Sequence, residues 1–128
     1  IELNRVAIHD GIEYLANSSS NKKMLDVIDY LNEHLTDDIS IDFLADTFFL
    51  SRYHLMHAFK EETGYTIGNY LTTKRLLLAR DLIQQGKPIT NVCYECGFRN
   101  YSTFSRAYKK NFGSSPREQF HQQTAHSK

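Results

Sequence analysis

The feature of this sequence that most restricts its fold is an internal repeat at an offset of 49 residues. Residues of the same kind recur in pairs at this offset, and the pairs are Ser51 and Asn100, Leu55 and Phe104, Ala58 and Ala107, Phe59 and Tyr108, Lys60 and Lys109, Gly64 and Gly113, and Thr66 and Ser115. A match at one fixed offset indicates a duplicated supersecondary unit. Each copy has the pattern of a short helix, a brief turn and a longer helix, which is the plan of a helix-turn-helix.

Helical periodicity also dominates the rest of the chain, and strand signals are nearly absent. The expected helices cover about 24–35, 41–48, 52–63, 66–85, 89–96, 101–112 and 116 onward. A further short helix is expected over 1–16, followed by a polar loop at 17–21. We therefore expect an all-α fold of about seven helices, homeodomain-like, in which two helix-turn-helix subdomains are joined by one long central helix.

The expected organisation has five parts along the chain. They are a linker or remnant of an upstream region (1–21), a first helix-turn-helix subdomain (22–65), a linker helix (66–86), a second helix-turn-helix subdomain (87–122) and a disordered tail (123–128). The linker helix has apolar residues on two nearly opposite sides, which predicts packing on both sides. The first stripe is Ile67, Leu71, Leu78 and Leu82, and the second is Leu76, Ala79 and Ile83.

The length of this linker helix fits the spacing of DNA grooves. About 20 residues at ~1.5 Å each give a strut of ~30 Å, and successive major-groove faces of a duplex lie ~34 Å apart. One chain could then hold two recognition helices over neighbouring turns and bind an asymmetric site without a dimer.

The longer helices of the repeat each carry a polar, partly cationic stripe opposite their apolar face. Tyr53, Met56, His57 and Lys60 have the spacing i, i+3, i+4 and i+7, and Ser102, Ser105, Arg106 and Lys109 occupy the same positions 49 residues later. Such stripes suit the major groove, where base edges offer donors, acceptors and thymine methyls. The residues expected to bind DNA are Arg52, Tyr53, Met56, His57 and Lys60 in the first helix, and Asn100, Tyr101, Ser102, Ser105, Arg106, Lys109 and Lys110 in the second.

These side chains have different expected roles. Arg106 can hold guanine with two hydrogen bonds or bind a phosphate, and His57, Ser102 and Ser105 can bond to bases or phosphates. Tyr53 and Met56 offer apolar contact to a thymine methyl or a sugar. The lysines Lys60, Lys109 and Lys110 are expected to contact phosphates, which position the protein without specifying sequence. An ordinary solvated helix face is the alternative interpretation of either stripe.

The charge of the chain is distributed unevenly. Residues 1–50 contain 3 Lys or Arg and 10 Asp or Glu, a net charge of −7, whereas residues 51–128 contain 12 and 5, a net charge of +7. This asymmetry favours an anionic partner for the basic part, and chance unevenness on solvated faces is the alternative. In the acidic part, Asp37, Asp38, Asp42 and Asp46 are interpreted as solvated and kept away from DNA, or as a docking surface for polymerase or a sensor domain.

The motif residues resemble the C-terminal DNA-binding domain of AraC/XylS-type bacterial transcription regulators over about residues 24–120. The matching residues are Leu44-Ala45, Ser51, Leu55, Phe59-Lys60, Gly64, Tyr70, Arg75, Ala79, Ile89, Gly97-Phe98, Phe104-Ser105-Arg106, Tyr108-Lys109-Lys110, Gly113 and Ser115-Pro116. The resemblance implies two helix-turn-helix motifs in adjacent major grooves of double-stranded DNA, often with bending of the duplex. It also implies activation through RNA polymerase. Three departures from the family pattern are Cys93, Phe49, where Gly or another turn residue is common, and Phe120-His121.

Other functional classes are less well supported. Cys93 and Cys96 have the spacing of a zinc or redox pair but no second pair, so we expect them to pack as small apolar residues. His54 and His57 lack an evident third metal ligand. We find no phosphate-binding loop and no nucleophile with a plausible base, so we expect no enzyme, no metal and no cofactor. The main alternative function is a helical protein-interaction module whose basic face binds an acidic partner.

The sequence also suggests a cellular context. It contains no long apolar run for a membrane span and no secretory signal, so we expect a cytoplasmic protein with no membrane partner. The chain begins at Ile1 rather than Met, which suggests a fragment of something longer. The family resemblance implies an upstream effector-sensing domain, which this chain lacks and in which we also expect the dimerisation surface.

Overall fold

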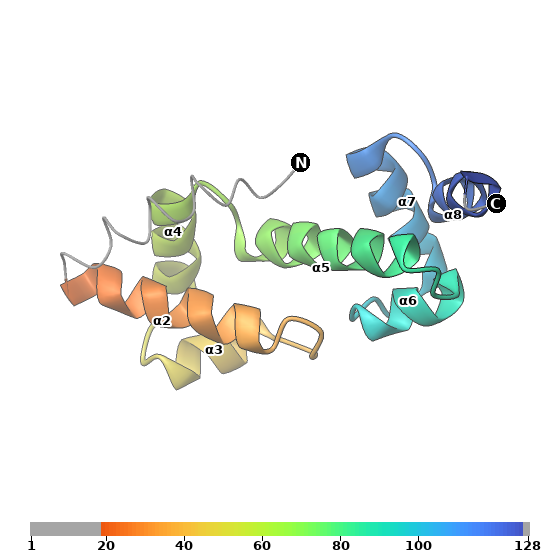
Figure 1. Cartoon of the computed structure of the whole chain (residues 1–128). Coiled ribbons are helices and arrows are strands. Elements are labelled where there is room, and N and C mark those ends of the chain that lie inside the picture. Colours follow the sequence, from red (N-terminus) through yellow and green to blue (C-terminus); the bar gives the residue numbers. More distant parts are fainter. Residues whose placement is uncertain (1–18, 127–128) are drawn as a thin grey trace. The chain divides into compact units, whose positions relative to one another are not determined.

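The computed structural model describes residues 19–126, and this part of the chain contains seven helices and no strand (Figure 1). The helices are α2 (Ser19–Glu33), α3 (Ile41–Thr47), α4 (Arg52–Thr63), α5 (Ile67–Gln84), α6 (Ile89–Glu95), α7 (Tyr101–Phe112) and α8 (Pro116–His126). The predicted all-α fold is confirmed. The helix expected over 1–16 lies outside the described residues.

Two helix ends differ from the sequence-based prediction. Helix α2 begins at Ser19, inside the stretch expected to be a loop, and α8 continues to His126, inside the expected disordered tail. Ser, Asn, Thr and His are only a few tenths of a kcal/mol less favourable in a helix than better formers. Extending an existing helix needs no new nucleus, so these residues join a neighbouring helix when no Gly or Pro intervenes.

The chain forms two compact units that divide within α5, between Leu71 and Thr72. In the first unit, α4 packs against both α2 and α3. Its core consists of Met24, Val27, Ile28, Leu31, Leu44, Ala45, Leu55, Phe59, Ile67, Tyr70 and Leu71. The ring of Phe59 meets that of Tyr70 edge-on, with centroids 5.7 Å apart. The Tyr70 hydroxyl donates a hydrogen bond of 2.8 Å to the side-chain oxygen of Asn32, which connects α5 to α2.

The second unit is built by α6, α7 and α8, which contact one another, together with the later turns of α5 (Figure 1). Its fully buried residues are Leu76, Ala79, Ile83, Val92, Cys93, Cys96, Phe104 and Tyr108. Each core therefore contains residues from its own helix-turn-helix and from one part of α5.

The two apolar stripes of α5 are arranged differently from the prediction. Leu78 and Leu82 pack against the same core as Leu76, Ala79 and Ile83, although they were expected on the opposite side. The buried residues of α5 are thus divided along the length of the helix rather than between two sides. The reason is that the helices of the second unit cover more of the circumference of α5 than a single partner helix would.

The two cysteines are core residues, as predicted. Cys93 and Cys96 are free thiols with no exposed surface. Burial raises the pKa of both thiols, and for Cys96 to about 12. The nearby Glu95 carboxylate also raises the pKa of Cys96. A thiol with so high a pKa stays protonated at neutral pH and behaves as a small apolar side chain.

Candidate nucleic-acid interface

The turn before each candidate recognition helix has the same backbone geometry. After α3, Phe49 has a φ of 57°, its N–H donates to the Asp46 carbonyl oxygen (3.3 Å), and the Leu50 N–H donates to the Ala45 carbonyl oxygen (2.9 Å). After α6, Gly97 has a φ of 96° and the N–H groups of Gly97 and Phe98 make the equivalent bonds. This pair of bonds around a left-handed residue is the Schellman motif. Phe49 therefore occupies the position for which the family pattern suggests Gly.

The structure refines the repeat found in the sequence. The turn residues Phe49 and Gly97 are 48 positions apart, whereas the caps Ser51 and Asn100 are 49 apart. The second turn is therefore one residue longer than the first. This single insertion, between Gly97 and the start of α7, leaves the hydrogen bonds at both ends of the turn intact.

The two candidate recognition helices, α4 and α7, begin and end in the same way. The Ser51 hydroxyl accepts a hydrogen bond from the His54 N–H (3.0 Å), and the Asn100 side-chain oxygen accepts one from the Thr103 N–H (2.8 Å). Both helices end at a left-handed glycine whose N–H donates to the carbonyl oxygen of the lysine four residues earlier. Each helix has 12 residues. The caps that the sequence predicts are confirmed.

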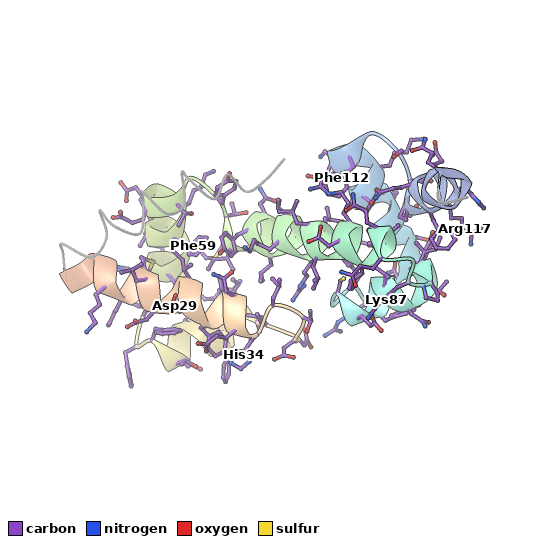
Figure 2. All side chains as sticks on the ribbon, in the orientation of Figure 1. Asp29, His34, Phe59, Lys87, Phe112 and Arg117 are labelled. Atoms are coloured by element: carbon purple, nitrogen blue, oxygen red, sulfur yellow. The ribbon has the colours of Figure 1, made fainter. Side chains whose placement is uncertain are left out.

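Most of the predicted DNA-binding residues form exposed stripes on these helices. The exposed ones are Arg52, Tyr53, Met56, His57, Lys60, Asn100, Ser102, Arg106, Lys109 and Lys110, and Ser105 is half-buried. On the opposite sides of the helices, Leu55, Phe59, Phe104 and Tyr108 are completely buried. Phe59 is labelled in Figure 2.

Tyr101 does not belong to the exposed stripe of α7. Its ring packs edge-on against Phe104, with centroids 5.9 Å apart, and the Arg117 guanidinium lies 5.6 Å from its ring centroid. Its hydroxyl is buried and has no hydrogen-bond partner among the described residues. The structure therefore places Tyr101 with the core between α7 and α8 rather than with the residues that face outward.

Carboxylates lie close to the basic groups of α4. The Arg52 guanidinium forms an ion pair of 3.1 Å with Asp42 of α3, and His57 lies 3.9 Å from Glu61. The His57 ring also stacks on Tyr53, with centroids 5.4 Å apart. Both ion pairs are well exposed to solvent, so each contributes little to stability. The Asp42 carboxylate does reduce the positive charge that Arg52 presents to an anion.

The basic groups of α7 are less constrained. Neither Arg106 nor Lys110 has a carboxylate within ion-pair distance in the part of the chain that the structure describes. Lys109 acts at longer range on Glu118 and contributes to the lowered pKa of that carboxyl group. The main causes of the lowered pKa are hydrogen bonds from Ser115 at the start of α8, whose backbone N–H donates to the Glu118 carboxylate at 3.2 Å. Helix α7 thus presents its charge more freely than α4.

Two residues that affect the site were not predicted to do so, and one of them, Asp42, was interpreted only as part of the acidic surface. Glu61 could have been found, because its spacing of four from His57 places both on one face of a helix. Asp42 could not, since it lies ten residues before Arg52 on another helix, and helical periodicity carries no information across a turn.

Two other kinds of site, a metal cluster and a membrane span, are absent from the described residues. No three His, Cys, Asp or Glu side chains gather closely enough there to hold a metal ion. None of the helices in that part of the chain is both long and apolar enough to cross a membrane.

Comparison with known proteins gives the family. Residues 44–122 match the family described as "Helix-turn-helix domain". A crystal structure of an AraC-type transcriptional regulator from Chromobacterium violaceum is 30% identical and superposes with a TM-score of 0.71, over 81% of this chain and 94% of that one. The chain belongs to the AraC/XylS family of helix-turn-helix domains. The resemblance inferred from the motif residues is therefore confirmed.

Two further similar proteins have known roles in transcription. The transcriptional activator RhaS of Escherichia coli is 36% identical over 107 residues, which cover 83% of this chain and 38% of RhaS. The chain thus spans well under half the length of this curated relative. The DNA-binding domain of AdpA, solved in complex with a target DNA, is 26% identical, with a TM-score of 0.74 over 80% of this chain and 94% of that domain.

Proposed function

We propose that this AraC-type domain binds double-stranded DNA in a sequence-specific manner, as the DNA-reading part of a bacterial transcription activator. Helices α4 and α7 would enter two adjacent segments of the major groove. The observation that carries the proposal is that an exposed polar stripe recurs on the second helix of two helix-turn-helix units. The solved DNA complex of the AdpA domain, which has the same fold, supports it.

Helix α7 has the chemistry to recognise guanine and to bind the backbone. The exposed Arg106 guanidinium can donate two hydrogen bonds to the O6 and N7 of guanine, the most common specific contact in the major groove. Ser102 and Ser105 can donate to or accept from neighbouring bases. Lys109 and Lys110, in the last turn of the helix, suit phosphate contacts, which determine register rather than sequence. Asn100, already used as the cap, has an amide N–H left to donate.

Helix α4 contributes a different set of groups. Tyr53, Met56 and His57 form its central stripe, and Lys60 is placed for a phosphate contact. Arg52 is exposed at the start of the helix but shares its charge with Asp42. We therefore assign to α4 more contact with base surfaces and less with phosphates than to α7.

The same proposal covers the wider protein. The named relative RhaS is a transcriptional activator of which this chain spans 38%, so we propose an upstream effector-sensing domain and a contact with RNA polymerase. A domain that binds promoter DNA acts in the bacterial cytoplasm. Its work is binding rather than catalysis, and the residues proposed for the interface need no cofactor.

The proposal is tested by selecting bound sites from a random duplex pool with the purified chain at two salt concentrations. We expect enrichment of two short sequence blocks, centred about one helical turn, ~10 base pairs, apart. Affinity should fall linearly with the logarithm of salt concentration, since phosphate contacts release counterions. Recovery of no sequence at low salt would refute DNA binding by this chain and favour the alternative, a basic surface for an acidic protein partner.

A further inference from the structure

The outward face of α4 is unusual for a DNA-contacting surface because large apolar side chains are exposed on it. Tyr53 is 77% exposed and Met56 is 46% exposed. Soluble domains gain nothing from leaving such side chains in water. The equivalent positions on α7, 49 residues later, are the small hydroxyl residues Ser102 and Ser105. The two helices of the duplication therefore present different chemistry at the same places.

A pocket lies beside these side chains, within the first unit. It has a volume of about 680 Å³. The described residues that line it are Ile41, Tyr53, Met56, His57, Lys60, Glu61, Thr66, Ile67 and Gly68. They come from the start of α3, the outward face of α4 and the start of α5. Much of this lining is carbon, contributed by two isoleucines, a methionine and a tyrosine ring.

The polar groups around the pocket are poorly suited to recognising guanine or cytosine. Arg52 is held by Asp42 at 3.1 Å, so its guanidinium is partly engaged before DNA arrives. Glu61 lies 3.9 Å from the His57 ring and places a carboxylate beside any base acceptor that approaches it. Lys60 is the remaining cation of the stripe, and it lies one turn beyond Met56, toward the end of the helix.

Among the chemical features of the major groove, only one is apolar. Guanine, cytosine and adenine present donors and acceptors there, whereas thymine adds a C5-methyl group. Apolar side chains on a recognition helix therefore favour thymine, whose C5-methyl group is the largest apolar group in the groove. This reasoning rests on the proposed function, because it takes α4 to be in the groove.

We infer that the first recognition helix selects thymine, with the C5-methyl group received between Tyr53 and Met56 at the mouth of this pocket. The second recognition helix, with Arg106 and two serines, selects through hydrogen bonds instead. One domain would then combine α4, which recognises bases through apolar contact, with α7, which recognises them through hydrogen bonds. The operator would have an A·T-rich block beside a block that contains guanine.

The test removes single methyl groups from the DNA. Each thymine of an operator selected as above is replaced in turn by deoxyuridine, which pairs identically but lacks the C5-methyl group. At the positions read by α4, we expect the affinity of the unchanged chain to fall about fourfold per methyl, which corresponds to ~0.8 kcal/mol for one buried carbon. In Met56→Ala and Tyr53→Ala chains, the ratio of affinities for thymine and deoxyuridine should approach one at those positions.

Ser105→Ala is the matched control, because Ser105 is the counterpart of Met56 on α7. It should leave the thymine-to-deoxyuridine ratio unchanged at those same positions, whatever it does to overall affinity. The inference is overturned if no deoxyuridine lowers affinity, or if every loss persists in the Met56→Ala and Tyr53→Ala chains. Both of these outcomes require a bound duplex and so leave the proposed function intact, whereas failure to select any duplex refutes the proposed function itself.

Discussion

The two helix-turn-helix units of this chain share their backbone and differ in their surface. Both have the same pattern of turn bonds, an oxygen cap on the second helix and a left-handed glycine at its end. The outward faces differ, with Tyr53 and Met56 on α4 and with Ser102 and Ser105 at the corresponding places on α7. The comparison shows that caps and turns are subject to local physical constraints, while exposed positions are free to acquire separate recognition chemistry.

The electrostatic surroundings of the two faces differ as well. Arg52 of the first unit has a carboxylate at 3.1 Å, whereas Arg106 of the second has none within ion-pair distance among the described residues. We therefore expect the second unit to provide more of the salt-dependent affinity. Four sets of variants test these differences between the two units.

The largest effect is expected in the cores. Phe104 contacts three aromatic rings, those of Phe98, Tyr101 and Tyr108, with centroids 5.1, 5.9 and 5.7 Å apart. Its counterpart in the first unit is the smaller Leu55. Phe104→Ala should lower the free energy of unfolding by about 3–5 kcal/mol, as measured by chemical denaturation, with loss of hydrogen-exchange protection in α6, α7 and α8. A cost no larger than that of Leu55→Ala would contradict the idea that the second core depends on this aromatic cluster.

The second effect concerns DNA recognition by α7. Arg106→Ala should weaken binding to the selected operator by about 1–3 kcal/mol and relax the base preference at one position. Lys109→Ala should weaken binding to all DNA sequences alike and reduce the steepness of log affinity against log salt concentration by about one. His57→Ala, at the position equivalent to Arg106, should cost less because the Glu61 carboxylate lies 3.9 Å from that ring and disfavours the approach of a base acceptor. Equal and negligible losses from the Arg106 and Lys109 changes would refute the placement of α7 in a groove.

The third effect is located in the two turns. A residue with a side chain pays about 1–2 kcal/mol to adopt the left-handed backbone conformation, and glycine avoids this cost. Part of the advantage of glycine is lost, because glycine has more conformational freedom in the unfolded chain. Gly97→Ala should therefore lower the free energy of unfolding by about 1 kcal/mol. Phe49→Gly should raise it by about 0.5 kcal/mol, since the Phe49 side chain is 87% exposed and loses little packing. Thermal unfolding of both variants measures the effects, and changes of the same sign would show that the turns are not equivalent.

The smallest effect is expected from the ion pair on α4. Asp42→Asn removes the carboxylate from Arg52, which then becomes free to approach a phosphate. Exposed ion pairs contribute about 0.2–1 kcal/mol, so DNA affinity at low salt should rise by about twofold to fivefold, with a steeper salt dependence. Asp46→Asn is the matched control, because it removes one negative charge from the same helix without touching the pair. If DNA affinity rises equally in both variants, the loss of one negative charge, rather than the release of Arg52, explains the rise.

Much of the interface was predictable because it depends on local chemistry. The caps Ser51 and Asn100 and the terminal glycines Gly64 and Gly113 act on groups within four residues of themselves, and such groups lie at fixed spacing in any helix. The outward positions of His57 and Arg106 follow from the period of 3.6 residues for the same reason. These features can be read from one segment at a time.

Other features could not be predicted from one segment. The structure places Tyr101 in the core although its position at the start of α7 suggested DNA contact, because α8 returns over it and brings Arg117 to its ring. Similarly, Leu78 and Leu82 join the second core because several helices meet this part of α5. In both cases the partner is far along the chain, so periodicity indicates that a side chain is apolar without indicating what covers it.

The amino-acid sequence alone predicts the duplicated helix-turn-helix plan, the ends of its recognition helices and the residues on their outward stripes. Only the packing of the helices shows how Arg52 is paired, how α5 is divided between two cores, and that Ile41 and Ile67 complete a pocket beside Met56. The physical reason is the range of the interactions. Hydrogen bonds within a helix act over three or four residues, while ion pairs, burial and pockets depend on which distant residues the packing of the helices brings together.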